Sequence, residues 1–178
     1  MVHDGRGNYM KTIRERKHRL PREAYQGEIE ASITVCVADR LNLFVNPEVV
    51  AAFIEMLREV AARRSCVVPV YCFMPDHLHL VLQGTSPEAD LWAAAKEFKQ
   101  RSGYWLHEQK EGFCWQKDFH DHLLRPGEDL AAHVRYVADN PCRKGLAATW
   151  EEYPYTGSIG CILGDVLAEL PSCRTCTP

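Results

Sequence analysis

Two histidines separated by a single residue are the first pattern in this sequence that could carry chemistry. His77 and His79 alternate with three leucines, Leu78, Leu80 and Leu82, in an apolar run with the period of a β-strand. Because successive strand side chains point to opposite faces, we expect both imidazoles on one face and the leucines on the core face. Two adjacent imidazoles can chelate one divalent metal ion. Two unconnected histidines on a strand are the alternative, which the pattern alone leaves open.

A tyrosine on a predicted helix is the second pattern of this kind. The helix begins near Glu128 and Asp129 and runs to Asn140, where Pro141 follows. The helical period puts Leu130, Val134 and Val137 on a core stripe, and His133, Tyr136 and Asn140 on the neighbouring stripe. If the helix packs beside the open sheet face, Asn140 is a candidate third ligand and Tyr136 lies next to the metal. The spacing by itself favours a simpler interpretation, in which Tyr136 is an amphipathic side chain at the edge of the core.

A second histidine pair, His120 and His122, lies in a strand-like run over residues 117–124. Its surroundings are a weaker indication of a metal site than the run that contains His77 and His79. We therefore expect His120, His122 and also His133 to act as outer contacts to the metal site or to the substrate.

The elements that must position these residues follow one another as strand, helix, strand, strand, helix, strand, helix. Strands are expected over residues 29–37, 66–73, 77–83 and 117–124, and helices from Asn46-Pro47, from Ser86-Pro87 and from about residue 128. The first six elements match the ferredoxin-like split βαβ arrangement. We therefore predict an α+β fold with an antiparallel sheet, helices on one face and an extra C-terminal helix. Its segments are a basic arm (1–22), a central domain (23–156) and a tail (157–178).

Composition indicates an ordinary globular chain, 46% hydrophobic and 25% charged. No apolar run approaches the roughly 20 residues of a membrane span, and the first twenty residues lack the apolar stretch of a secretory signal. We therefore expect a cytoplasmic protein with reduced cysteines. Cys173 and Cys176 form one C-x-x-C pair without the second pair that a structural zinc site needs, so we expect no zinc there.

The charge is unevenly distributed along the chain. Residues 1–22 hold seven basic side chains against Asp4 and Glu15, a balance of +5, so the net charge of −3 leaves −8 on the remainder. A basic arm on an acidic body can serve as a foothold on phosphates. A solvated leader without a binding role is the equally weighted alternative.

Four blocks of the sequence together resemble the one-tyrosine transposases of the HUH superfamily, and especially the REP-associated tyrosine transposases. In chain order they are residues 18–21 with 33–40, residues 74–79 (Met-Pro-Asp-His-Leu-His), residues 115–122 (Trp-Gln-Lys-Asp-Phe-His-Asp-His), and residues 136–146, which contain Tyr136 and Asn140-Pro141. The resemblance covers about residues 16–156. One departure is Asp76, where many relatives carry asparagine, and we expect this change not to touch the chemistry.

The resemblance implies the site and the reaction. His77, His79 and Asn140 match the ligands of Mg²⁺ or Mn²⁺, which polarises a phosphate of single-stranded DNA beside a hairpin. Tyr136 matches the nucleophile that forms a 5′-phosphotyrosine and frees a 3′-OH. The protein would act as a monomer or homodimer, cytoplasmic and nucleoid-associated. The candidate DNA contacts are Arg14, Arg16, Lys17, Arg19, Lys96, Lys99, Arg143 and Lys144.

Two other functions compete with this interpretation. A domesticated, sequence-specific DNA-binding protein would keep the fold without catalysis, but it has no need of His77, His79 and Tyr136 together. A metal-dependent hydrolase of a small substrate could use the two histidines, but the further acidic ligands of a dinuclear site do not follow at the usual spacing.

Overall fold

The structure is a computed structural model that describes residues 20–125 and 127–168. Its strands are β1 (Glu30–Cys36), β2 (Cys66–Met74), β3 (His77–Gly84), β4 (His120–Leu123) and β5 (Thr156–Ile159). Its helices are α1 (Pro47–Arg63), α2 (Leu91–Gln109), α3 (Leu130–Ala138), α4 (Asn140–Arg143) and α5 (Leu163–Ala168), with 3₁₀ turns η1 (Arg22–Tyr25) and η2 (Ala38–Arg40).

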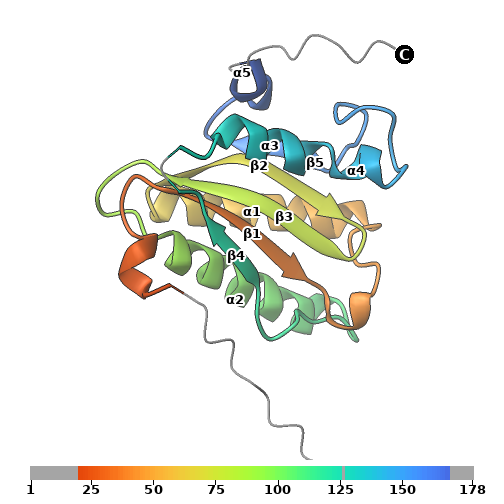
Figure 1. The fold of residues 1–178 in the computed structure, drawn as a ribbon. Helices are drawn as coiled ribbons and strands as arrows, with labels where there is room; N and C mark the ends of the chain where they lie inside the picture. The colour runs from red at the N-terminus through yellow and green to blue at the C-terminus, as the bar shows by residue number, and fades with distance from the viewer. Residues whose placement is uncertain (1–19, 126, 169–178) are drawn as a thin grey trace, which may run out of the picture.

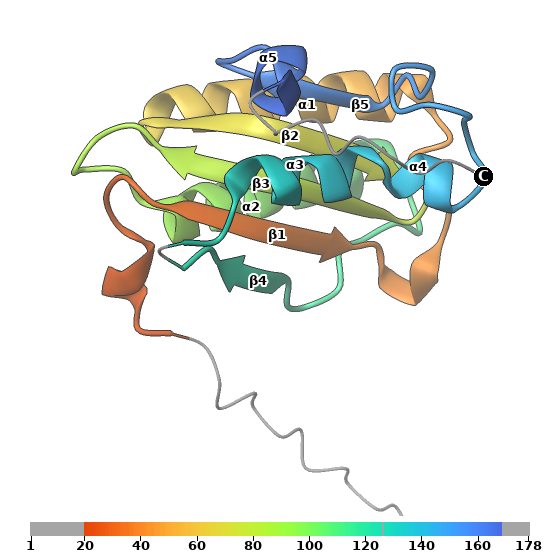
Figure 2. The same ribbon diagram turned by 45° about the horizontal axis from the view of Figure 1, so that its top comes forward.

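The strands form one sheet in the order β4-β1-β3-β2-β5, and each neighbouring pair is antiparallel. Helices α1 and α2 lie on one face, whereas α3 crosses the other face (Figures 1 and 2). This arrangement confirms the predicted α+β fold with a split βαβ core and an extra C-terminal helix. The fifth strand, β5, was not predicted; it extends the sheet beside β2 and begins at the last residue of the expected central domain, so that the rest of it lies in the segment expected to be a tail.

The main core fills the space between the sheet and helices α1 and α2. The leucines of β3 that alternate with the histidines are buried there, as the strand period requires: Leu78, Leu80 and Leu82 are at most 2% exposed. Phe53 of α1 and Phe98 of α2 pack edge to face in this core, with their ring centroids 6.0 Å apart. The leucine face of β3 therefore anchors the strand, and its histidine face points away from this core.

A second, smaller core lies on the opposite face of the sheet. Val134 and Val137 of α3 pack there against Val70 and Val81 of the central strands, and Leu163 of α5 joins the same cluster. The predicted core stripe of α3 is thus buried. Because α3 covers β2 and β3, the histidine face is partly closed rather than fully open (Figure 2).

The helix starts are partly as predicted. Asn46 caps α1, and its Oδ1 accepts a hydrogen bond from the Glu48 N–H at 2.9 Å. The start predicted at Ser86-Pro87 is wrong, because α2 begins at Leu91, and its cap is Asp90, which accepts from the Ala93 N–H at 2.8 Å. Ser86 instead accepts from the Glu88 N–H in the preceding turn. Within the described part of the chain, no helix has both the length and the apolarity to cross a membrane.

Candidate metal centre and tyrosine

His77 and His79 project from β3 toward one another. Their Nε2 atoms are 3.0 Å apart and their rings meet edge to face at 4.6 Å. Two cis ligands of an octahedral ion, each bound at about 2.1 Å, are about 3.0 Å apart. The two imidazole nitrogens are therefore spaced as the ligands of one divalent ion would be.

The other ring nitrogen of each histidine is held by a second residue. Thr34 of β1, which pairs with His79 across the strands, places its Oγ1 2.8 Å from His79 Nδ1. Asp76 Oδ1 lies 2.5 Å from His77 Nδ1, and Arg40 donates to Asp76 Oδ2 at 3.2 Å. Such contacts fix the ring orientation of metal-binding histidines. Asp76, which was expected not to touch the chemistry, thus contacts the ring of His77.

Burial and charge keep this cluster ready to bind a cation. Burial, followed by the nearby charges of His77 and Arg143, lowers the pKa of His79 to about 4. Burial alone would raise the pKa of Asp76, but its hydrogen bond to His77 and the charges of His77 and Arg40 outweigh burial and lower it. His79 is thus neutral and Asp76 ionised at neutral pH, the protonation states that a metal site requires.

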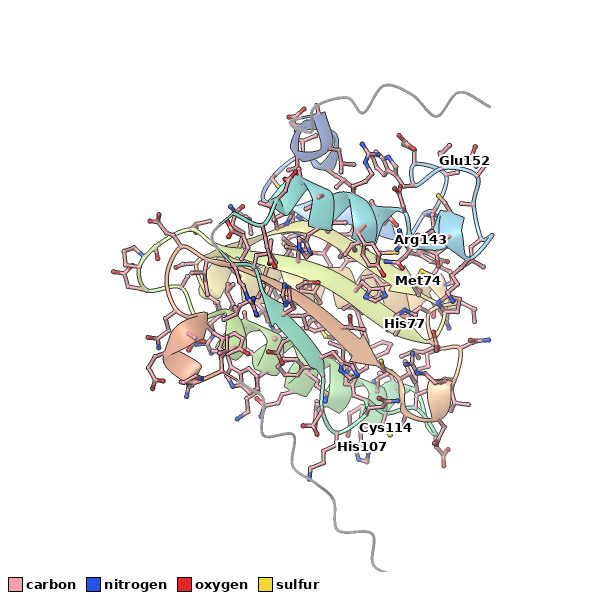
Figure 3. The ribbon with its side chains drawn as sticks, viewed as in Figure 1. Met74, His77, His107, Cys114, Arg143 and Glu152 are labelled. Carbon is pink, nitrogen blue, oxygen red and sulfur yellow. The ribbon has the colours of Figure 1, made fainter. Side chains whose placement is uncertain are left out.

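Tyr136 stands on α3, and its side chain is exposed (61%) rather than at the edge of the core. Its backbone carbonyl accepts a hydrogen bond from Arg143 Nη2 at 2.7 Å, and the Arg143 guanidinium covers its ring at 4.0 Å. The positive charge of the same guanidinium contributes to the lowered pKa of His79. Figure 3 shows Arg143 near His77 and Met74 at one end of the sheet. Arg143 therefore connects the tyrosine to the histidine pair.

Asn140 follows a break between α3 and α4. The helix ends at Ala138 rather than at Asn140, and Asp139 separates it from α4. The amide of Asn140 donates to the carbonyl of Val137 at 3.2 Å, and its Oδ1 accepts from Arg143 Nη2 at 2.9 Å. An amide oxygen has two lone pairs, so this hydrogen bond leaves one that a metal ion could take.

The other predicted histidines lie on and beside the edge strand β4. Thr34 of β1 pairs with His120 on one side and with His79 on the other. Because residues paired across strands point to the same face, His120 lies on the sheet face of the histidine pair. His122 lies 3.0 Å from Glu128, and His133 of α3 approaches the same carboxylate at 3.9 Å. The structure thus joins His122 and His133 to each other through Glu128.

The predicted DNA contacts fall into three groups. Arg143 and Lys144 follow α3, and Arg143 stacks on the tyrosine. Lys96 and Lys99 stand on α2, which covers the sheet face opposite to the histidines, and Lys99 donates to the carbonyls of Gln116 and Lys117. The structure therefore does not bring these two lysines to the histidine pair. The remaining candidates, Arg14, Arg16, Lys17 and Arg19, lie outside the described residues, as does the Cys173/Cys176 pair.

Three residues of this cluster were missed or misjudged from the sequence. Thr34 occupies a polar position in an alternating strand, a signal that marks its face but not its partner. Asp76 precedes His77 directly, and that adjacency could have suggested a role. Arg143 was predicted to contact DNA, but its stacking on Tyr136 depends on the turn between α3 and α4.

Comparisons with known proteins agree with this architecture. The family model "Transposase IS200 like" matches residues 25–140. A candidate REP-associated tyrosine transposase of Haemophilus influenzae is 26% identical over 141 residues, covering 69% of this chain and 76% of that protein. The REP-associated tyrosine transposase of Escherichia coli is 24% identical over 106 residues, which cover 57% of this chain and 62% of that protein. A solved REP-associated tyrosine transposase bound to a REP hairpin has the same fold, with a TM-score of 0.65 at 19% identity over 79% of this chain and 81% of that one.

Proposed function

Because this chain belongs to the IS200-like transposase family, whose members cut and join DNA, we propose that it cleaves single-stranded DNA beside a hairpin with Tyr136 as the nucleophile. The observation that carries this proposal is the exposed tyrosine under Arg143, whose guanidinium also acts on His79 of the pair with converging Nε2 atoms. The hairpin substrate is inferred from the solved relative, which is bound to a REP hairpin.

His77, His79 and Asn140 offer a donor set that suits a divalent ion such as Mn²⁺ or Mg²⁺. Their donor atoms are two imidazole nitrogens and one amide oxygen, and the converging Nε2 atoms have the spacing of two ligands of one ion. A bound ion would polarise the scissile phosphate and stabilise the charge that builds on it. Thr34 and Asp76 hold the two rings in the orientation that this binding requires.

Tyr136 would act on the phosphate as follows. Its phenolic oxygen attacks the phosphorus and loses its proton to solvent, the bond to the 3′ oxygen breaks, and the departing 3′ oxygen takes up a proton, which leaves a 5′-phosphotyrosine and a free 3′-OH. Arg143 places a guanidinium against the attacking ring, where it can bind a phosphate oxygen. A 3′-OH then attacks the phosphotyrosine, restores the phenol and rejoins a DNA strand.

The test is covalent adduct formation by the full chain with a labelled single-stranded hairpin oligonucleotide and Mn²⁺. We expect a band that survives denaturation in the wild type and in Tyr104→Phe, the matched control, because Tyr104 is 68% exposed on α2. Tyr136→Phe should fold and bind the hairpin but form no adduct, because it lacks only the attacking oxygen. Mass spectrometry should place the DNA on Tyr136.

The failures of this test separate the competing functions. Cleavage that persists in Tyr136→Phe would show a water nucleophile and favour a hydrolase. Hairpin binding without cleavage by the wild type, with Mn²⁺ or Mg²⁺ present, would favour a DNA-binding protein without catalysis.

A further inference from the structure

Three side chains apart from His77 and His79 converge near the start of α3. They are His122 of β4, Glu128 of the loop that follows and His133 of α3, and one ligand atom from each lies within 4.8 Å of the others. His122 Nε2 and His133 Nε2 are 3.0 and 3.9 Å from the same oxygen, Glu128 Oε2. Their rings stack with centroids 5.7 Å apart and an angle of 22°.

These separations match those in a tetrahedral metal site. Bonds of about 2.0–2.2 Å at the tetrahedral angle put the ligand atoms about 3.4 Å apart. The two nitrogen–oxygen distances, 3.0 and 3.9 Å, lie on either side of that value. Two histidines and one glutamate, with the fourth position left for water, are a ligand set that Zn²⁺ takes in proteins.

Each of the three ligands is held by the fold. The backbone of His122 is fixed by its pairing with Ser32 in the sheet, and that of His133 by its hydrogen bond to the carbonyl of Asp129 at 3.1 Å. Glu128 Oε2 accepts the Arg125 N–H at 3.0 Å, and this hydrogen bond, followed by that of His122, lowers the pKa of Glu128. The side chains of His122, Glu128 and His133 are 48%, 34% and 32% exposed, so an ion can reach them from solvent.

We propose that His122, Glu128 and His133 form a second metal site, which binds a transition-metal ion of the Zn²⁺ type and is separate from the His77/His79 centre. An ion held there connects β4 to α3 three residues before Tyr136. It would fix the position of this helix over the sheet and thereby the position of Tyr136. That consequence rests on the proposed function, whereas the metal binding itself does not.

The test is a Co²⁺ titration followed by visible absorbance, which reports tetrahedral coordination. It uses the full chain with Cys173→Ser, Cys176→Ser, His77→Ala and His79→Ala, so that neither the tail thiols nor the first centre contributes. We expect one equivalent of Co²⁺ to bind with a tetrahedral spectrum, and Zn²⁺ to displace it. Added Glu128→Gln or His133→Ala should weaken binding about a hundredfold or more.

The matched control is His107→Ala on α2. His107 also lies beside a glutamate, Glu108, at 4.0 Å, but its side chain is 81% exposed and has no third ligand in the described cluster. It should leave the titration unchanged. If Glu128→Gln and His133→Ala, both shown to be folded by circular dichroism, titrate like their parent, or if the parent binds no Co²⁺, the second site does not exist. Because this readout is independent of cleavage, it can fail while the DNA adduct forms, and the reverse also holds.

Discussion

At the scale of single residues, the histidine pair shows how neighbours determine what a side chain can do. Each imidazole has one nitrogen held by the protein and the other directed at its partner. Thr34 can hold His79 only because β1 and β3 pair in the register that sets these two residues opposite each other. The metal-binding geometry is therefore a property of two strands and a turn rather than of the His-Leu-His motif alone.

The lowered pKa of His79 predicts a pH-dependent stability. With a folded pKa of about 4 and an ordinary value of 6.5, the unfolded chain binds a proton between these values that the folded chain does not. The free energy of unfolding should therefore fall by up to about 3 kcal/mol as the pH drops from 7 to 4, and be unaffected by this group above about pH 7. Urea unfolding with EDTA present measures it. In His79→Gln the fall should be smaller, and parallel curves for the two proteins would contradict the assignment.

Removing His77 should remove the first metal centre without unfolding the chain. We expect His77→Ala to lower Mn²⁺ affinity at least about tenfold and to change the free energy of unfolding by less than about 1 kcal/mol, because the ring is not part of either apolar core. Calorimetry in a His133→Ala background isolates this centre. His120→Ala, on the same sheet face, is the matched control. A loss of Mn²⁺ binding in the control alone would assign the ligands to the other pair.

At the scale of elements, α3 decides whether the tyrosine meets the histidines. Its apolar stripe, Val134 and Val137, packs on the central strands, and this packing turns the stripe with Tyr136 outward. The helix is only nine residues long, so its ends contribute much of its stability. Its position is thus sensitive to the groups at its two ends.

The cap of α3 provides a direct test of that sensitivity. Asp129 accepts a hydrogen bond from the Ala131 N–H at 2.9 Å, so Asp129→Ala should cost about 1 kcal/mol of stability and slow adduct formation more than it weakens hairpin binding. The matched control is Asp139→Ala, because Asp139 precedes α4 without a side-chain capping bond. Urea unfolding and adduct kinetics measure both variants. Equal losses in the two would show that α3 does not depend on its cap.

At the scale of the whole molecule, positive and negative charges are concentrated in different parts of the chain. The sheet carries a core on each face, and the body after residue 22 holds a charge of −8. A polyanion must approach such a body through local positive groups. Arg143, which stacks on Tyr136, and Lys144 at the end of α4 provide two of these, and the basic arm, whose first 19 residues lie outside the described part, provides more.

Deletion of residues 1–17 tests the role of the arm. The deletion removes Arg6, Lys11, Arg14, Arg16 and Lys17 together with Asp4 and Glu15. If these side chains contact phosphates, hairpin affinity should fall, and the slope of log K against log salt should flatten by about 0.7 per lost single-strand contact. Binding at three salt concentrations for both proteins measures the slope. An unchanged slope would mean that the arm is only a leader.

The sequence by itself determined the features that depend on local periodicity. The alternation around His77 and His79 places the leucines in the core, and the helical stripe of Val134 and Val137 places them against the sheet, as the structure confirms. The order of the first six elements was sufficient for the fold class. These features are predictable because each is set by residues only a few positions apart.

Only the tertiary structure decided which distant side chains meet. Thr34 contacts His79 across 45 residues, and Glu128 joins two histidines that belong to different elements. The strand β5 has too short and polar a sequence to be recognised without β2 beside it. Such contacts follow from strand register and from the packing of α3 on the sheet, both of which are set by the combined burial of many side chains and by no single segment.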